Sequence, residues 1–451
     1  MIELVRRVAA TDPDRVAVVT HEVSLTYAEL LAASERAAAR LRASGIARLA
    51  TVDAEATTLL PVLLAGAEAG VEVCQYPPVG PGEVAALAER FEHEVVLGPA
   101  YGNLESAQIC ADSLKNTAES ARVCADSARP HLVLTTGTTG APKGVRHDWD
   151  RLVASVRRVA QAPDTPEQRW LLAYGLHQFA GLQILLHVFA AGATLVAPAP
   201  RRPIEGLAAM RALGVTHASA TPTYWRFLLA EMRADGGPVP ALRQVTLGGE
   251  AIPGPLLERI RAAFPGAGVS QVYAASEFGS SGSMRDGRPG LSTSVLERGE
   301  DADVQMRIVD GELWVRSRVG MLGYWGEEPV DADGWRATGD TVTVEGDRIL
   351  FAGRVSDIIN VGGVKVHPLP IEERVAALPG VDLVRVFGRP NAMTGAIVAV
   401  EIVAAPEADT PALKDAVRAA CADLPAAARP RSIKFVDSLG TAGDKIVRRT
   451  P

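Results

Sequence analysis

One segment of the sequence combines glycine, threonine and lysine in a way that suits phosphate binding. It reads TTGTTGAPKG over residues 135–144 and directly follows an apolar stretch at 132–134 that is typical of a buried strand. Glycines allow backbone N–H groups to turn toward an anion, threonine hydroxyls add donors, and Lys143 adds a positive charge. The predicted phosphate contacts besides this lysine are Thr135, Thr136, Gly137, Thr138, Thr139 and Gly140.

This loop differs from a Walker A loop, which needs serine or threonine after the lysine, because Pro142 precedes the lysine and Gly144 follows it. It resembles the phosphate loop of the adenylate-forming superfamily, which includes acyl- and aryl-CoA synthetases, peptide-synthetase adenylation domains and luciferase. Further motifs similar to that family's follow in the same order and cover nearly the whole chain, which is more compact than many members. The resemblance implies ATP and Mg²⁺ as cofactors.

Two motifs in the middle of the chain resemble segments of that family that line its binding sites. The sequence GLHQFAG at 175–181 resembles the motif in which a histidine, here His177, begins a helix beside the acyl pocket. The sequence LGGEA at 247–251 resembles the segment that packs against adenine, which implies this role for Gly249 and Glu250.

A third motif, YAASE at 273–277, resembles the family pattern aromatic-Gly-x-Thr-Glu. The resemblance implies that Tyr273 stacks on the base, that Ser276 donates to a phosphate and that Glu277 helps to hold Mg²⁺. A hard cation bound through oxygen ligands would screen the repulsion between a triphosphate and a carboxylate. Ala274 stands where glycine is common, and the serine stands where threonine is common.

Two later motifs imply contacts to the ribose and a pivot between domains. In the TGD sequence that ends at Asp340, the carboxylate would accept hydrogen bonds from both ribose hydroxyls. The sequence GRVSD at 353–357 resembles the hinge segment of the family, in which Arg354 contacts the ribose and Ser356 takes the place of the pivot. That pivot is commonly Asp or Lys, so a role for charge at the hinge is not expected.

The C-terminal part of the chain carries the motifs that the family uses to complete its reaction. The segment 359–368 resembles the loop that lines the thiol tunnel, where Gly362 and Gly363 would allow the close approach of a pantetheine arm. Lys445 matches the catalytic lysine, although Asp444 stands between it and the usual glycine. Its implied role is electrostatic, because a positive charge would stabilise the carboxylate and the α-phosphate during attack.

The acyl pocket is expected to draw on several separate segments of the chain. The segment after His177 offers no Asp to pair with an α-ammonium group, so α-amino acids are expected to be poor substrates. Compact relatives include ligases of aromatic acids, and an aromatic acid is therefore favoured. The predicted pocket residues are His177, Gln178, Thr221, Tyr224, Gly248, Ala275 and Ser281, and the predicted catalytic residues are Lys445, His177 and Glu277.

Together these motifs imply a two-step reaction. A carboxylate attacks the α-phosphorus of Mg·ATP to give an acyl adenylate, and the thiol of CoA or of a carrier-protein pantetheine then displaces AMP to form a thioester. Two alternatives stay open: adenylation of nitrite for diazotisation of an aryl amine, and a non-catalytic nucleotide-binding relative. Product mass spectrometry would distinguish nitrite adenylation from thioester formation. The charged residues kept at each predicted ATP contact argue against a non-catalytic relative.

The elements that must position these residues alternate between strands and helices. Apolar stretches at 15–19, 195–196 and 245–247 predict strands, and Thr26 with Glu29 forms a capping box that opens a helix. This pattern predicts an α/β fold with ligands at the carboxyl ends of the strands. Around 312–344, short segments with Trp314, Trp325 and Trp335 predict a small β-rich subdomain, and the last hundred or so residues predict a small α+β domain.

The expected domains are a large N-terminal adenylation domain over residues 1–353, a hinge over 354–357 and a small mobile C-terminal lid over 358–451. Domain rotation would let one site present different groups in two successive steps.

Composition limits the remaining possibilities. The 451 residues carry a net charge of −7, which gives no basic footprint for nucleic acid or an anionic membrane. The stretch 170–200 has no charged residue, but its histidines, glutamines and glycines favour the buried interior of a globular fold over a membrane span. Four separated cysteines and no visible secretory signal predict a cytoplasmic protein.

Overall fold

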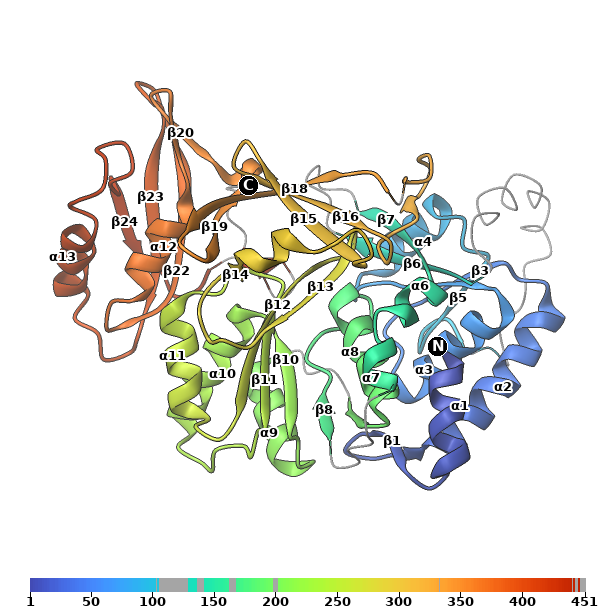
Figure 1. Cartoon of the computed structure of the whole chain (residues 1–451). Helices are drawn as coiled ribbons and strands as arrows, with labels where there is room; N and C mark the ends of the chain where they lie inside the picture. The colour runs from blue at the N-terminus through green and yellow to red at the C-terminus, as the bar shows by residue number, and fades with distance from the viewer. Residues whose placement is uncertain are drawn as a thin grey trace.

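The structure is a computed structural model. It describes residues 1–102, 104, 129–135, 142–161, 168–197, 202–331 and 333–439, together with the backbone of 441–442 and 445–446. Figure 1 shows three sheets in the large part of the chain and a separate C-terminal part that lies beside α10 and α11.

The first sheet has six strands in the order β17-β7-β6-β4-β3-β5. The strands β6-β4-β3-β5 pair in parallel, as expected where strands alternate with helices along the chain. After β6 the chain reverses, and β7 pairs with β6 antiparallel. The predicted capping box is confirmed, because the Thr26 hydroxyl accepts from Glu29 N and the Glu29 carboxylate accepts from Thr26 N. The elements are α1 Ile2–Thr11, α2 Tyr27–Ser44, β3 Arg48–Thr51, α3 Ala56–Ala69, β4 Glu72–Gln75, α4 Pro81–Arg90, β5 Val95–Leu97, β6 Pro130–Thr135, β7 Lys143–Asp148 and β17 Gly323–Tyr324.

The second sheet has eight strands in the order β13-β12-β11-β10-β8-β9-β1-β2, with parallel pairing from β12 through β1. Parallel neighbours bring the carboxyl ends of β10, β11 and β12 to one edge. The elements are β1 Val16–Val19, β2 Ser24–Thr26, α6 Trp149–Ala154, α7 Arg157–Ala160, β8 Arg169–Leu171, α8 Phe179–Ala191, β9 Thr194–Val196, α9 Pro203–Ala212, β10 His217–Ala220, α10 Pro222–Asp235, β11 Gln244–Gly248, α11 Gly254–Ala263, β12 Gly268–Ala275 and β13 Gly279–Met284.

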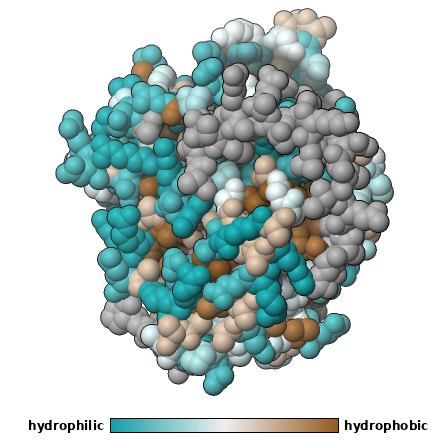
Figure 2. Space-filling view, turned by 90° about the vertical axis from the view of Figure 1, so that its right-hand side faces the viewer, coloured by the Kyte–Doolittle hydropathy of each residue, from teal (hydrophilic) through white to brown (hydrophobic). Residues whose placement is uncertain are grey.

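Within the charge-free stretch, the described residues 170–197 contribute to β8, α8 and β9. Most residues of α8 are buried, and they join one hydrophobic core with residues of α1, α2 and α3. This agrees with the prediction of a buried interior. None of the helices within the described residues is long and apolar enough to cross a membrane. On the face shown in Figure 2, apolar side chains lie in small groups among hydrophilic ones.

A third, antiparallel sheet has the order β14-β19-β18-β16-β15, which confirms the predicted β-rich subdomain. Trp325 was expected in this unit, but it follows β17 of the first sheet, where its ring packs against Phe91 with 6.1 Å between the ring centroids. The elements are β14 Leu291–Ser292, η2 Thr293–Glu297, β15 Val304–Val309, β16 Glu312–Ser317, β18 Arg336–Glu345 and β19 Arg348–Arg354.

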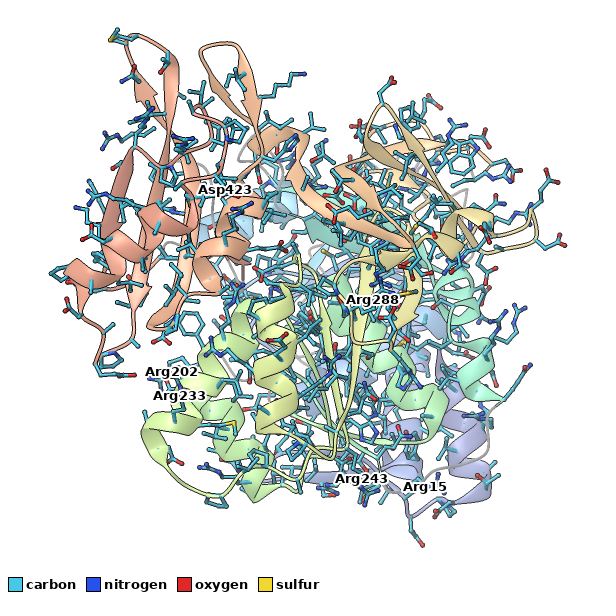
Figure 3. The ribbon with its side chains drawn as sticks, turned by 60° about the vertical axis from the view of Figure 1, so that its left-hand side comes forward. Arg15, Arg202, Arg233, Arg243, Arg288 and Asp423 are labelled. Carbon is cyan, nitrogen blue, oxygen red and sulfur yellow. The ribbon has the colours of Figure 1, made fainter. Side chains whose placement is uncertain are left out.

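The C-terminal part forms its own sheet, β21-β20-β23-β22, with β24 beside β23 and with a separate hydrophobic core. It touches the large part through α10, α11 and β19, and Arg233 of α10 pairs with Asp382 of β22 at 2.9 Å. Arg233 is labelled on this side of the large part in Figure 3. The elements are η3 Val355–Asp357, β20 Ile359–Val361, β21 Val364–Val366, α12 Pro368–Ala376, β22 Val381–Asn391, β23 Gly395–Ala404, α13 Thr410–Ala420, β24 Ser432–Phe435, β25 Thr441–Ala442 and β26 Lys445–Ile446.

Candidate active site

One cavity of about 2120 Å³ begins at the carboxyl ends of β10, β11 and β12. Parallel sheets bind ligands at this edge, so the location agrees with the topology. The cavity brings together predicted site residues that lie more than 200 positions apart in the sequence. Those that line it are Thr135, Lys143, His177, Gln178, Thr221, Gly248, Gly249, Glu250, Tyr273, Ala275, Ser276, Glu277, Asp340, Arg354 and Ser356.

Some of the remaining predicted residues lie elsewhere in the structure, and the others are outside the described residues. Tyr224 is buried in α10, and Ser281 is buried with its hydroxyl donating to the carbonyl of Tyr273 at 2.9 Å. Gly362 and Gly363 form the turn between β20 and β21 away from the cavity. Thr136, Gly137, Thr138, Thr139 and Gly140 lie outside the described residues, as does the side chain of Lys445.

The predicted ribose contacts form a connected group. Asp340 and Arg354 are cross-strand partners on β18 and β19, and the Arg354 guanidinium pairs with the Asp340 carboxylate at 3.1 Å. The Tyr273 hydroxyl donates to the other oxygen of that carboxylate at 2.6 Å. A carboxylate has about four lone-pair sites, so it could still accept from ribose hydroxyls. Burial, followed by the charge of Asp340, raises the pKa of the Tyr273 phenol and keeps it protonated as the donor.

The Tyr273 ring is held by aromatic neighbours. Its centroid lies 5.2 Å from that of Phe278 and 4.9 Å from that of Phe351, and Phe351 also lines the cavity. This packing and the hydrogen bond to Asp340 fix the ring at the cavity wall. Its stacking on a base stays a prediction.

Glu277, the predicted magnesium ligand, is linked to the phosphate loop by a residue that the sequence analysis did not identify. Tyr324 donates its hydroxyl to Glu277 Oε1 at 3.1 Å, and Lys143 Nζ lies 4.7 Å from the centre of the Tyr324 ring. Pairing of β17 with β7 positions this tyrosine beside the loop. Burial, followed by the nearby carboxylate, raises the pKa of Tyr324, so its hydroxyl remains a donor.

The donor set of this corner fits a hydrated magnesium ion bound mainly by phosphate. Mg²⁺ in nucleotide sites is usually held by one or two carboxylates, water and phosphate oxygens. Glu277 supplies one such carboxylate, and no cluster of three acidic, histidine or cysteine side chains for an all-protein metal site occurs among the described residues.

Glu250 has a structural contact that its motif did not reveal. Its carboxylate accepts from the backbone N–H of Thr223 at 3.0 Å and from the Thr223 hydroxyl, so it binds the N-terminus of α10. Thr221, at the N-cap of that helix, accepts from Tyr224 N at 3.0 Å. These contacts fix the wall of the cavity where β10 and β11 end.

His177 lies just before α8, whose first helical residue is Phe179, so the histidine precedes the N-cap residue Gln178. The motif predicts that the histidine begins the helix, but the helix begins two residues later. A Cβ atom on Gly175 would lie 2.3 Å from the His177 ring, which explains the glycine at that position. Burial lowers the pKa of His177, which favours a neutral imidazole at the cavity wall.

Ser356 is in the short helix η3 that joins β19 to the C-terminal sheet, and its hydroxyl donates to Asp357 at 3.0 Å. In the structure, where the C-terminal part packs against β19, Leu369 of α12 also lines the cavity. The hinge and the proposed boundary near residue 354 stay predictions.

The comparisons with known proteins agree with this architecture. The family model described as "AMP-binding enzyme" matches residues 5–325, and the model for the C-terminal domain of AMP-binding enzymes matches residues 370–442. The chain is 30% identical over 304 residues to a 2-succinylbenzoate–CoA ligase of Salmonella typhimurium, covering 66% of this chain and 62% of that protein. It is 28% identical over 477 residues to a feruloyl-CoA synthase of Amycolatopsis, covering 97% and 95% of the two chains.

Two solved structures show the same fold. An anthranilate CoA ligase in complex with anthranoyl-AMP aligns with a TM-score of 0.82 and 19% identity over 99% of this chain and 95% of that one. An o-succinylbenzoate CoA synthetase from Bacillus subtilis in complex with ATP and magnesium ion aligns with a TM-score of 0.75 and 22% identity over 99% and 97%. The chain therefore belongs to the adenylate-forming family of AMP-binding enzymes, with a large AMP-binding domain and a small C-terminal domain, and acyl- and aryl-CoA ligases are among its relatives.

Proposed function

We propose that this protein activates an organic acid, preferably an aromatic one, by forming an acyl adenylate from Mg·ATP. It then transfers the acyl group to the thiol of CoA or of a carrier-protein pantetheine. The observation that carries the proposal is the convergence of Lys143, Glu277, Asp340 and Arg354 on one cavity, from four separate segments of the chain.

The residues have distinct roles in this proposal. Asp340 and Arg354 orient the ribose, while Lys143 lies toward the phosphates. Mg²⁺, held by Glu277 and phosphate oxygens, would supply charge neutralisation at the triphosphate. His177 and Gln178 belong to the predicted acyl pocket and line the same cavity, where they can orient the attacking carboxylate. Lys445 remains the candidate for stabilising the charge at the α-phosphate.

The relatives favour an aromatic acid, and a local sequence feature disfavours α-amino acids. The relatives include enzymes named for feruloyl, anthranilate and succinylbenzoate substrates. In addition, no acidic side chain lies beside His177 in the GLHQFAG segment to pair with the ammonium group of an α-amino acid.

Acid-dependent exchange of labelled pyrophosphate into ATP tests the first step. We expect aromatic acids to support exchange at least about tenfold better than α-amino acids, a difference of about 1.4 kcal/mol in transition-state binding. Faster exchange with amino acids would contradict the preference, and no exchange with any acid would contradict the activity.

Mass spectrometry of the products tests the acceptor. Incubations with CoA, with a pantetheinylated carrier protein, and with nitrite plus an amino-aryl acid separate the three outcomes. The proposal predicts a thioester in one of the first two incubations. A diazo product in the nitrite incubation, with no thioester in the other two, would contradict thioester formation and support the nitrite alternative.

A further inference from the structure

The cavity extends beyond the predicted acyl pocket into a region that none of the family motifs covers. Helix α8 forms one wall, and β8, β10, β11 and β12 form the other. We call this region the distal chamber and define it by six residues that line the cavity: Gln183, His187, His217, Gln244, Ser270 and Arg285.

The sheet wall of the distal chamber is polar. His217 of β10 pairs with Gln244 of β11, and Thr246 of β11 pairs with Ser270 of β12, all lining the cavity. On the opposite face of the same strands the residues are apolar, as with Val245 and Leu247. Parallel strands buried on both faces are normally apolar throughout. Gln244 and Thr246 both hydrogen-bond to Ser270 at 2.9 Å. The alternation therefore makes this wall of the distal chamber polar, although its side chains bond to one another.

The helix wall adds polar groups to an otherwise apolar helix. Gln183 and His187 are four residues apart on α8, so they share the face that lines the cavity. The Gln183 Nε2 atom is buried and has no hydrogen-bond partner among the described residues. A buried donor without a partner costs about 1–3 kcal/mol, which a bound acceptor would offset.

The distal chamber is also electropositive. Arg285 has no ion pair or hydrogen bond within the described parts of the chain, and it acts on the nearby His187. Burial and this arginine lower the pKa of His187 to about 4, and burial with His187 and Arg243 lowers the pKa of His217 to about 4. The acidic residues that line the cavity come from other segments, namely Glu83, Glu250, Glu277, Glu312, Asp340 and Asp357.

The distal chamber lies well away from the site where the acid would be adenylated. Gly248 and Gln244 mark the two ends on β11, and four residues of strand span about 13 Å. Arg243, which precedes β11, is labelled in Figure 3 at the lower edge of the molecule, close to the label of Arg15. An acid would therefore have to be extended to reach both ends.

We propose that the acid activated by this protein carries a second anionic group, such as a carboxylate, at the end opposite the carboxyl group that is adenylated, and that the distal chamber binds this group. This inference rests on the proposed acid-activating function. Arg285 supplies the counter-charge, while Gln183 and the neutral imidazoles supply hydrogen-bond donors.

Two rigid acids of similar length test the proposal: 4-carboxycinnamate and 4-methylcinnamate. In pyrophosphate exchange we expect kcat/KM for the carboxy acid to exceed that for the methyl acid at least about tenfold, the effect of one charged hydrogen bond. Arg285→Met should abolish most of this preference and leave kcat/KM for the methyl acid within about twofold. The matched control is Arg418→Met, which removes an exposed arginine of α13 that does not line the cavity.

A second variant keeps the test independent of Arg285. Gln183→Glu places a carboxylate in the distal chamber and should invert the preference, so that the methyl acid becomes the better substrate. Equal kcat/KM for the carboxy and methyl acids, or an unchanged preference in Arg285→Met, would overturn the proposal while leaving the acid-activating function intact. Exchange that fails with every acid, including benzoate and hexanoate, would instead overturn the proposed function itself.

Discussion

At the scale of single residues, the site depends on side chains that hold one another in place. Tyr273 and Arg354 both bind the carboxylate of Asp340, and Tyr324 connects Lys143 to Glu277. Tyrosine can do this because its ring packs against apolar or cationic groups while its hydroxyl bonds to a carboxylate. The predicted phosphate and magnesium residues are thus joined by a tyrosine from a different part of the chain.

The hydroxyl of Tyr324 should therefore matter for catalysis more than for folding. Tyr324→Phe keeps the ring beside Lys143 and removes the donor to Glu277. Because hydrogen bonds to charged groups contribute about 1.5–3 kcal/mol, we expect kcat for pyrophosphate exchange to fall at least about tenfold. Tyr101→Phe is the control, since Tyr101 is exposed and does not line the cavity. An equal fall in kcat in both variants would contradict a specific role of the Tyr324 hydroxyl.

A second residue-scale prediction concerns the acid pocket. In Gly175→Ala, the new Cβ would collide with the His177 ring, and overpacking of this kind costs about 1–3 kcal/mol. We expect KM for the acid to rise about tenfold, while KM for ATP stays within about twofold. Gly266→Ala is a matched control, because a Cβ there meets no atom within 4 Å. An unchanged KM for the acid would show that the ring position of His177 does not govern acid binding.

At the scale of elements, the C-terminal part contacts the large part through α10, α11 and β19. The pair Arg233–Asp382 joins α10 to β22, with 55% and 20% of the two side chains exposed. Exposed ion pairs contribute about 0–1 kcal/mol, so this pair can favour one orientation only slightly. A weak contact of this kind suits a domain that is proposed to rotate between two steps.

Arg233→Met should accordingly change the balance between the half-reactions by a small factor. In the present orientation Gly362 and Gly363 do not line the cavity, so loss of the ion pair should favour the other orientation. We expect the ratio of thioester-forming to adenylate-forming rates to rise by up to about fivefold in separate single-turnover assays. Arg374→Met, which breaks the Arg374–Asp423 pair within the C-terminal part, should leave the ratio unchanged. A fall in the ratio for Arg233→Met would contradict this account.

Local patterns in the sequence predicted many elements correctly. The strands around 15–19, 132–134, 195–196 and 245–247 are present, because each is an apolar stretch bounded by turn residues. Sheet partners could not be predicted in this way. The pairing of β17 with β7 joins residues about 180 positions apart, and it is this pairing that moves Trp325 out of the β-rich unit and brings Tyr324 to Glu277.

The distal chamber was missed for a related reason. The alternation of polar and apolar residues in His217–Ala220 and Gln244–Gly248 is visible in the sequence, but it is also typical of a strand with one face in solvent. Only the packing of α8 against this face makes the polar side an interior wall. The predicted nucleotide contacts were easier to propose from the sequence, because each belongs to a short motif with its own chemistry. That Lys143, Glu277, Asp340 and Arg354 line one cavity agrees with the prediction, but their contacts to a nucleotide stay predictions.

At the scale of the whole molecule, buried titratable groups should make stability depend on pH. Burial lowers the pKa of His93, His131 and His147 to about 3 in the folded protein, against about 6.5 in an unfolded chain. Between these values the unfolded state binds more protons, so stability falls as pH decreases below 6.5. Burial of Glu72 acts in the opposite direction between about 4.5 and 7, because it raises the pKa of this carboxyl to about 7.

His147 offers the cleanest test of this pH dependence, because neither of its ring nitrogens has a hydrogen-bond partner among the described residues. His147→Leu should reduce the loss of unfolding free energy from pH 6 to pH 5 by up to about 1.4 kcal/mol, the contribution of one proton. Urea unfolding at pH 6 and at pH 5 measures this difference in unfolding free energy. His21→Leu, at an exposed position, should leave the difference unchanged. An identical pH dependence in His147→Leu and the parent would contradict the assignment.

The central claim is that the cavity joins a carboxylate to the α-phosphorus of ATP. The most direct test uses an aromatic acid with ¹⁸O in both carboxyl oxygens, followed by mass spectrometry of the AMP after thioester formation. Attack by the carboxylate predicts that one ¹⁸O atom appears in each AMP molecule and that none appears in pyrophosphate. AMP without label, or label in pyrophosphate or inorganic phosphate, would contradict the account.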